Sequence, residues 1–466
     1  MASPDTLQSL TDKADALKAA GRIGEAIEVY ARAVAIAPRS AVAEHNLAAA
    51  LGDVARYAEA EAGCGRAFAK GLDAPETWLV LARARQGLRR FDEAEAGYRE
   101  ALRRRPLMID AHRDLAQLTW MRTGDIALAT ATLDRALEAH GNNPALHLVK
   151  AKALEYAGDP AGAYAALEAV AGRFDDVVIE VMAANAAAQA GAFEAALHHA
   201  EKACRFDPQN PLAQSMRAQT LLAVGGADQA APIIDGLRRW RPQDQFFIAL
   251  QATAWRLMND PRAHEVNDYP GLVRGWRLDR PAAWATLDAY LADLAAALTG
   301  EHAYLTHPFD QSVRHGSQTP NILSVDQPAI RAFPEAVSGP IQAHIDDLGA
   351  GADPVRSRNT GRWRFQGVWS VRLRPNGFHA DHVHPDGWLS SACYIDLPAA
   401  VDGGGKQGWI KFGEPGVPVR PPLAAEHYVK PEPGLLVLFP SYMWHGTVPF
   451  SGEDRRLTVA FDLVPA

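Results

Sequence analysis

The sequence has few cysteines, no long apolar run and no secretion-type N-terminus. Only three of its 466 residues are cysteines, Cys64, Cys204 and Cys393, and no CxxC pair occurs. This count excludes a disulfide-stabilised scaffold and indicates a reducing compartment. No stretch approaches about 18 consecutive apolar residues, and no basic segment followed by an apolar one opens the chain, so neither a membrane span nor a leader is expected. The cytoplasm is the predicted location.

An excess of basic charge is also lacking. The formal net charge is −8, which argues against nucleic acid or an anionic membrane surface as the main partner. Hydrophobic residues make up 48% of the chain and charged residues 22%, as in ordinary globular proteins. Because 466 residues are too many for one ordinary core, we expect two or three domains.

A repeated element runs through the first half of the chain, from about residue 8 to residue 257. In this alanine-rich, helix-favouring sequence, a turn residue is followed five places later by an alanine, and successive alanines lie 33 to 35 residues apart. The pairs are Gly21 and Ala26, Ala55 and Ala60, Arg89 and Ala94, Gly124 and Ala129, Gly158 and Ala163, Gly191 and Ala196, and Gly225 and Ala230. Prolines that would end the second helix of a unit stand at Pro38, Pro106, Pro144, Pro208 and Pro242.

This helix–turn–helix period resembles the tetratricopeptide repeat, and residues 20–38 and 91–102 match that family's pattern well. The resemblance implies about seven repeats over residues 1–257, stacked into an α-solenoid because no unit can bury its apolar face alone. It also implies a groove for a peptide or protein partner. A structural spacer or a dimerisation arm is the alternative.

Residues 258–360 are expected to form a helical connector and the entry to a second domain. Apolar residues recur at helical spacing over residues 282–298, and a further helix is predicted over residues 328–348. Residues 307–319 between them are too polar for a simple core strand. They fit either a solvated loop or a lining of a catalytic mouth.

After Gly361 the sequence changes to short strands between glycine and proline turns. Strands are predicted over residues 362–373, 388–397, 409–412, 434–439 and 457–464. Many short strands without intervening helices indicate a small β domain, here a double-stranded β-helix of the jelly-roll or cupin type over residues 361–466. The predicted fold class is therefore multidomain α + β, an α-solenoid followed by this β domain.

Histidines and carboxylates cluster at the start of the β domain. Two pairs overlap there, His379-x-Asp381 and His382-x-His384, and His445 follows about sixty residues later. Side chains two residues apart lie on one face of a strand. Non-haem Fe(II) sites hold the metal by three such ligands and leave positions open for a cosubstrate and O₂. The pattern therefore predicts an iron site with His445 as the distant ligand and either pair as the close ligands.

An arginine follows His445 at about ten residues. The far carboxylate of 2-oxoglutarate needs a fixed cation, and the arginine fork matches a carboxylate. Arg456 has the same strand parity as Thr458 and Ala460, which are small enough to leave room for this cosubstrate. Arg455 has the parity of the apolar residues of a packed face, so Arg456 is preferred and Arg455 is the alternative.

At these residues the chain resembles a bacterial family of 2-oxoglutarate/Fe(II) oxygenases that is often fused to tetratricopeptide repeats. The matching motifs are His382-Val383-His384-Pro385 with Tyr394, and the run 431–440 with His445. Residues 311–319 also look like that family. A more distant resemblance is to aspartyl/asparaginyl β-hydroxylase, which likewise joins such repeats to an oxygenase barrel.

The β-hydroxylase motif and the general pattern of the wider oxygenase superfamily imply different ligand sets. Against the β-hydroxylase motif, His382 and His445 are implied as ligands, and His384 takes the place of the missing carboxylate as a third. The wider superfamily pattern implies His379, Asp381 and His445 instead. The β-hydroxylase comparison also implies that Ser370 donates a hydrogen bond to 2-oxoglutarate.

These observations predict an Fe(II)- and 2-oxoglutarate-dependent dioxygenase that hydroxylates a C–H bond and releases succinate and CO₂. O₂ is the oxidant, and ascorbate is a candidate reductant. The resemblance to the β-hydroxylases implies a peptide or protein substrate presented by the repeats. Two alternatives stay open: a non-catalytic interaction scaffold with a degenerate barrel, and a cupin-type metalloenzyme that does not use 2-oxoglutarate.

Overall fold

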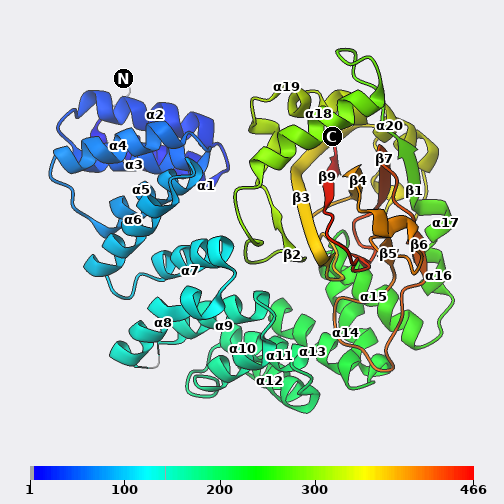
Figure 1. Cartoon of the computed structure of the whole chain (residues 1–466). Helices are drawn as coiled ribbons and strands as arrows, with labels where there is room; N and C mark the ends of the chain where they lie inside the picture. Colours follow the sequence, from blue (N-terminus) through cyan, green and yellow to red (C-terminus); the bar gives the residue numbers. More distant parts are fainter. Residues whose placement is uncertain (1–4, 142) are drawn as a thin grey trace. The chain divides into compact units, whose positions relative to one another are not determined.

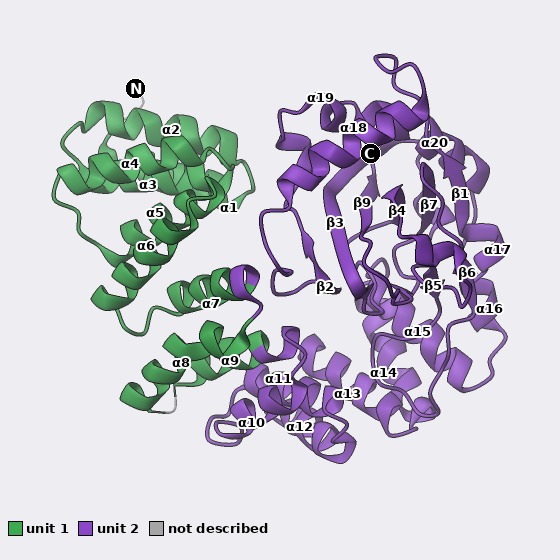
Figure 2. Ribbon diagram, in the orientation of Figure 1, with its two compact units in different colours: residues 1–120, 125–153 green, residues 121–124, 154–466 purple. Residues whose placement is uncertain are grey.

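The computed structural model describes residues 5–141 and 143–466, and the chain divides into two compact units (Figure 2). One unit comprises residues 1–120 and 125–153, and the other residues 121–124 and 154–466. Residues 1–4, which the predicted repeat segment includes, lie outside the described residues.

Helices alone make up the first half of the described chain, in seven successive pairs (Figure 1). The helices are α1 Leu7–Ala19, α2 Ile23–Ile36, α3 Ala41–Asp53, α4 Tyr57–Ala69, α5 Pro75–Gly87, α6 Phe91–Arg104, α7 Ile109–Thr123, α8 Ile126–His140, α9 Pro144–Tyr156, α10 Pro160–Glu168, α11 Val177–Gln189, α12 Phe193–Phe206, α13 Pro211–Ala223 and α14 Ala227–Trp240. A further helix, α15 Gln245–Leu257, follows the seventh pair. The predicted helical solenoid is confirmed.

The repeated turn has a backbone reason. All seven predicted turn residues have a left-handed conformation, with φ between 60° and 90°. Glycine adopts this conformation without a steric cost, whereas Ala55 and Arg89 adopt it with a side chain. The alanine five residues later is at most 2% exposed in every unit. A larger residue there would separate the two helices of the pair.

The β domain contains two antiparallel sheets (Figure 1). One has six strands in the order β1-β7-β4-β9-β3-β2, and the other has three strands in the order β6-β5-β8. The strands are β1 Arg274–Arg277, β2 Val313–Gln318, β3 Trp363–His379, β4 Leu389–Asp396, β5 Ile410–Phe412, β6 His427–Val429, β7 Leu435–Pro440, β8 His445–Thr447 and β9 Arg456–Pro465. The expected solenoid followed by a β domain is confirmed. The description of the β domain as a double-stranded β-helix stays a prediction.

The connector between the repeats and the β domain contributes strands as well as helices. Helix α18 (Leu287–Glu301) and helix α20 (Phe333–Leu348) lie where helices were predicted, and a short helix α19 (Pro328–Arg331) precedes α20. Strands β1 and β2 were not predicted from the sequence. Both are edge strands of the six-stranded sheet, and an edge strand pairs on one side only, so its side chains need not follow the pattern of a core strand. The boundaries at residues 257 and 360 stay predictions.

The main core lies between the six-stranded sheet and helices α18 and α20. Leu294 of α18 and Ile341 of α20 are fully buried in one cluster with Leu438 of β7 and Phe461 of β9. This cluster fixes the sheet, and thereby the strands that approach the histidines.

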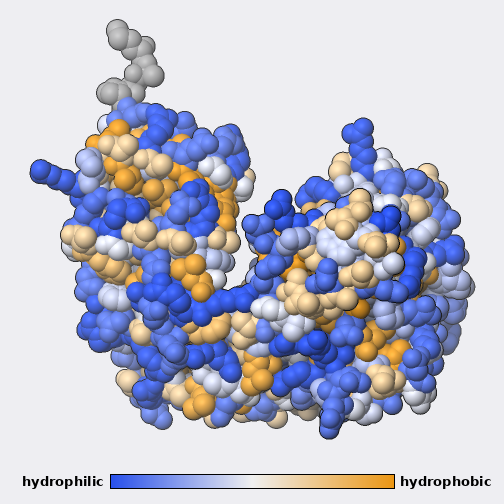
Figure 3. Space-filling view, turned by 45° about the horizontal axis from the view of Figure 1, so that its top comes forward, coloured by the Kyte–Doolittle hydropathy of each residue, from blue (hydrophilic) through white to orange (hydrophobic). Residues whose placement is uncertain are grey.

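Hydrophobic and hydrophilic residues are mixed on the surface. On the face shown in Figure 3, hydrophobic residues are scattered among hydrophilic ones, as is common because polar residues cannot cover a whole surface. Among the described residues, none of the helices carries an apolar stretch long enough to cross a membrane.

Candidate metal centre

Two segments of the β domain carry the histidines, and the backbone joins them. The backbone N–H of His382 donates to the carbonyl oxygen of His445 at 3.0 Å, and the N–H of His445 donates to the carbonyl of His382 at 3.1 Å. This reciprocal pair is an isolated antiparallel bridge next to β8. It brings together two histidines that are far apart in the sequence.

Each of three imidazole rings has its Nδ1 atom held by an acceptor. Nδ1 of His382 lies 2.8 Å from the carbonyl oxygen of Ala380, and Nδ1 of His445 lies 2.9 Å from that of Met443. Nδ1 of His384 lies 2.6 Å from Oδ2 of Asp462. Because carbonyl and carboxylate oxygens only accept, Nδ1 carries a proton in each ring, and Nε2 is the atom that can offer a lone pair to a cation.

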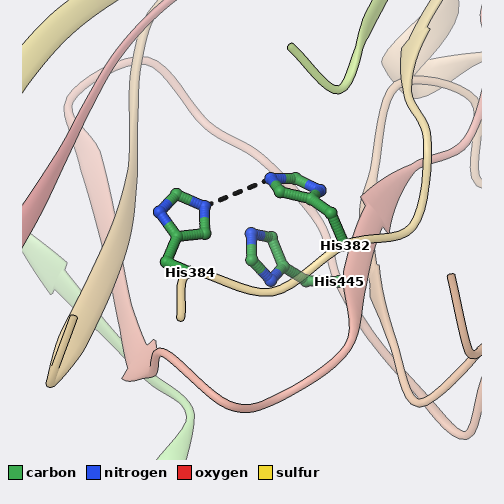
Figure 4. Close-up of side chains that lie close together, drawn as sticks. All are labelled: His382, His384 and His445. Atoms are coloured by element: carbon green, nitrogen blue, oxygen red, sulfur yellow. Dashed lines mark hydrogen bonds between the residues drawn. The ribbon is translucent and has the colours of Figure 1, made fainter. Parts of the chain in front are cut away.

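The imidazole rings of His382, His384 and His445 lie close together (Figure 4). One ligand atom from each of His382, His384 and His445 lies within 4.8 Å of the others, and Nε2 of His384 is 3.1 Å from Nε2 of His382. Two lone pairs at this distance repel each other unless a cation lies between them. The residues therefore fit a metal ion, and imidazole nitrogen suits iron, zinc and copper.

Burial keeps two rings of the cluster, His382 and His445, uncharged. Removal from water and, to a smaller extent, the neighbouring His384 together lower the pKa of His382 to about 3. Burial likewise holds the pKa of His445 well below its ordinary value. Neutral imidazole is the form that binds a metal. At neutral pH a metal therefore does not have to displace a proton from the Nε2 of either of these two rings.

The alternative pair, His379 and Asp381, does not converge with His445 as His382 and His384 do. His379 lines the same cavity, but its Nδ1 lies 3.0 Å from Oγ of Ser312, and it does not belong to the converging cluster. Asp381 points elsewhere, since its Oδ2 accepts from Nζ of Lys411 at 2.8 Å. The structure thus assembles the His382, His384 and His445 set and directs Asp381 to a lysine.

A cavity of about 410 Å³ opens beside the cluster, and Arg456 lies on its wall. The arginine is 2% exposed, its Nε donates to the carbonyl of Gly408 at 3.2 Å, and its Cζ lies 5.0 Å from the ring centroid of Tyr394. Among the described residues no carboxylate forms an ion pair with it. A buried guanidinium without a counterion is costly, so the cavity offers a site for an anion.

The two arginines differ as the strand parity predicts. Arg456, Thr458 and Ala460 of β9 all line the cavity. The side chain of Arg455 is 47% exposed, and its Nε lies 3.6 Å from Oδ2 of Asp396 on the surface. Arg455 therefore does not reach the cavity.

The comparisons with known families agree with this arrangement. A family model described as "Putative 2OG-Fe(II) oxygenase" matches residues 367–462, and two tetratricopeptide repeat models match residues 7–40 and 79–144. The chain carries tetratricopeptide repeats and a C-terminal domain of this oxygenase family. No curated protein matches the chain.

Several solved structures are similar to the repeats. The C-terminal part of a repeat-containing protein from Cytophaga hutchinsonii is 16% identical, with 52% of this chain and 98% of that chain covered and a TM-score of 0.37. A tetratricopeptide repeat protein from Parabacteroides merdae is 16% identical, with 53% and 98% covered and a TM-score of 0.36. The first tetratricopeptide repeat domain of Spaghetti, solved with a bound HSP90 peptide, is 25% identical, with 24% and 90% covered and a TM-score of 0.24.

Within the oxygenase-family domain, Ser370 is not among the residues that line the cavity. It is fully buried, its hydroxyl donates to the carbonyl of Thr458 at 3.1 Å, and it lies 3.1 Å from Nε2 of His302. The neighbouring Trp369 lines the cavity, and successive side chains of a strand point to opposite faces. The structure therefore does not bring Ser370 to the expected cosubstrate position.

Sequence reasoning missed two polar residues, Asp462 and Ser312, that contact the candidate ligands. Asp462 has the same parity on β9 as Arg456, so the alternation of the strand could have revealed it. Ser312, whose Oγ lies 3.2 Å from Nε2 of His382, falls in the polar run 307–319. The polarity of that run was the only signal, and pairing of β2 with β3 was needed to place it.

Proposed function

We propose that this protein is an Fe(II)- and 2-oxoglutarate-dependent dioxygenase that hydroxylates a side chain of a peptide or protein. One observation carries the proposal: three converging imidazoles and a buried arginine, which has no carboxylate partner among the described residues, line the same cavity. A metal that binds imidazole and a cosubstrate that carries carboxylates would satisfy both groups.

His382, His384 and His445 would hold the metal, and Arg456 would hold the far carboxylate of 2-oxoglutarate through a two-pronged, charge-assisted contact. Thr458 and Ala460, which follow Arg456 on the same face of β9, leave space for the cosubstrate chain. Bound Fe(II) supplies the activation of O₂ that is coupled to oxidative decarboxylation of 2-oxoglutarate.

The cavity walls would exclude water from the reacting atoms. Phe439 and Ile410 line the cavity and are at most 4% exposed. The volume of about 410 Å³ suits a small cosubstrate together with one substrate side chain. Ascorbate would serve as the reductant that restores Fe(II).

Tetratricopeptide repeats generally mediate protein interactions, which supports a peptide or protein substrate that the repeats bind. The three free cysteines fit a reducing compartment such as the cytoplasm.

Anaerobic titration of the Fe(II)-loaded protein with 2-oxoglutarate tests the proposal. A weak visible charge-transfer band and formation of succinate after O₂ is admitted are the expected results. Metal binding without this band would favour a cupin-type metalloenzyme. Absence of metal binding would favour an interaction scaffold, and either result would overturn the dioxygenase proposal.

A further inference from the structure

Residues beside the candidate ligands pack on the last helices of the repeats. These helices, α13 to α15, lie next to the β domain in Figure 1. Val383, between the two close histidines, is 9% exposed, and Trp444, before His445, is 6% exposed. Both belong to one hydrophobic cluster with Leu221 of α13 and Phe247 of α15. The three histidines thus line the cavity, Trp444 packs against the repeats, and Val383 contacts both the cavity and the repeats.

A buried hydrogen bond fixes the side chain next to His445. Nε1 of Trp444 donates to Oγ1 of Thr253 on α15 at 2.9 Å, and the Thr253 hydroxyl donates in turn to the carbonyl of Ala249 at 2.8 Å. Thr253 is 2% exposed, so water cannot replace it. The ring of Phe246 meets the indole edge-on, with 6.0 Å between centroids. The indole is therefore held on α15 by both a polar and an aromatic contact.

The same helix also holds the other histidine segment. The backbone N–H of Gln245, the first residue of α15, donates to the carbonyl of Pro385 at 3.1 Å. An N–H at this position has no partner within its own helix, so it is free for this contact. At the other end of α15, Arg256 donates to the carbonyl of Gly413, whose N–H donates to the carbonyl of Trp444 at 2.9 Å. Helix α15 thus contacts both segments that carry the ligands.

We propose that α15 is part of the metal centre and that Thr253 is a positioning residue that acts through Trp444 on His445. This inference rests on the proposed metal function. Trp444 and His445 are consecutive, and Nδ1 of His445 is bonded to the carbonyl of Met443 in the same turn. A shift of the indole therefore moves the backbone that sets the Nε2 of His445. Thr253, although outside the residues that the oxygenase model matches, controls how tightly the metal is bound.

Co(II) titration of the full chain tests this role, with the dissociation constant and the visible d–d spectrum as readouts. Thr253→Val removes the acceptor and keeps the shape. We expect Co(II) binding to weaken about tenfold with an altered spectrum, as when a residue that orients a metal ligand is changed. Thr253→Ser restores the hydroxyl and should return both readouts to those of the unchanged protein. Trp444→Phe should reproduce the effect, and the double variant should add nothing further.

Thr220→Val is the matched control. Thr220 lies on α13, is 1% exposed, and donates to the carbonyl of Arg217 at 3.0 Å without touching Trp444. Its replacement should leave the Co(II) constant and spectrum unchanged even where the melting temperature falls. Unchanged Co(II) binding in Thr253→Val, or equal weakening in Thr220→Val, would overturn the positioning role. Failure of the unchanged protein to bind Co(II) would instead overturn the metal centre itself.

Discussion

Oδ2 of Asp462 accepts a hydrogen bond from Nδ1 of His384 at 2.6 Å, so a carboxylate stands directly behind one of the three converging imidazoles. Non-haem iron sites commonly include one carboxylate among the ligands themselves. Here the three candidate ligands are imidazole rings, and the carboxylate lies one hydrogen bond further out. Oγ of Ser390 donates to the other carboxylate oxygen at 2.7 Å and holds it in place.

Asp462→Asn is expected to weaken metal binding. The amide oxygen can still accept from His384, but the negative charge that raises the basicity of the imidazole is lost. We expect the dissociation constant for Co(II) to rise about tenfold to a hundredfold, as measured by titration. Asp396→Asn, at a carboxylate that is 46% exposed beside Arg455, should have no effect. Equal binding in Asp462→Asn and the unchanged protein would show that the carboxylate only orients the ring.

The ligand set can be tested by separating the two overlapping pairs. His382→Ala removes one of the three converging nitrogen atoms, and the charge-transfer band with Fe(II) and 2-oxoglutarate should disappear. Asp381→Asn should retain the band because its side chain pairs with Lys411 and lies outside the cluster. The reverse pattern, loss in Asp381→Asn and retention in His382→Ala, would assign the metal to His379 and Asp381.

The sequence could not decide between these pairs because both have the spacing i and i+2. That spacing places two side chains on one face only within a strand, and β3 ends at His379. Beyond it the N–H of Ala380 donates to the carbonyl of Ser312 at 2.8 Å, and the chain turns so that Asp381 meets Lys411. Lys411 is distant from Asp381 in the sequence, so no local pattern predicts this ion pair.

The repeats and Arg456 could be predicted because their signals are local. A motif that recurs at a fixed spacing indicates a repeated turn. The alternation of side chains along a strand indicates which of two neighbouring arginines faces inward. Strand β2 and the contact between Thr253 and Trp444 depend on pairing between distant segments. Composition carries little information about such pairing, so both became visible only in the structure.

Arg456→Gln should lower the affinity for 2-oxoglutarate without a comparable effect on metal binding. Loss of a two-pronged contact between guanidinium and carboxylate is worth about 3 kcal/mol, which corresponds to about a hundredfold change in the dissociation constant. Titration of the Fe(II)-loaded variant followed by the visible band measures it. Arg455→Gln is the matched control, since this neighbour lies on the surface, and it should bind 2-oxoglutarate normally. Equal losses in both variants would contradict the assignment of Arg456.

His344 on α20 should make the fold sensitive to acid. It is fully buried, Nδ1 accepts from Nε1 of Trp276 at 3.2 Å, and burial lowers its pKa to about 4, with Asp347 and Arg274 as the nearby charges. Folding therefore favours the neutral ring. The stabilisation is fully present above the unfolded pKa of about 6.5 and is lost as the pH falls towards 4, because the unfolded chain takes up the proton first.

His344→Gln, which keeps an acceptor for Trp276, should reduce that sensitivity. Between pH 7 and pH 5 the histidine is expected to cost about 2 kcal/mol of unfolding free energy, and urea unfolding at both values measures the loss. The variant should lose less stability over this interval by about that amount. Replacement of the exposed His264 by Gln provides the control and should leave the loss unchanged. An equal loss in His344→Gln would mean that another group dominates the acid response.

Glycine should increase the stability of the repeats at the two left-handed turn positions that lack it, Ala55 and Arg89. Ala55 has φ 60° where most units have glycine, and a side chain in this conformation costs about 1–2 kcal/mol. Glycine removes that cost but adds about 0.5–1 kcal/mol of chain entropy to the unfolded state, so Ala55→Gly should stabilise the repeats by roughly 0.5–1 kcal/mol. Gly21→Ala is the reciprocal change: φ is 75° and no atom lies within 4 Å of the added Cβ, so only the backbone is tested, and we expect a similar loss. Urea unfolding followed by helical circular dichroism measures both. A destabilised Ala55→Gly together with an unaffected Gly21→Ala would mean that the turn tolerates side chains and that contacts between repeats alone set their stability.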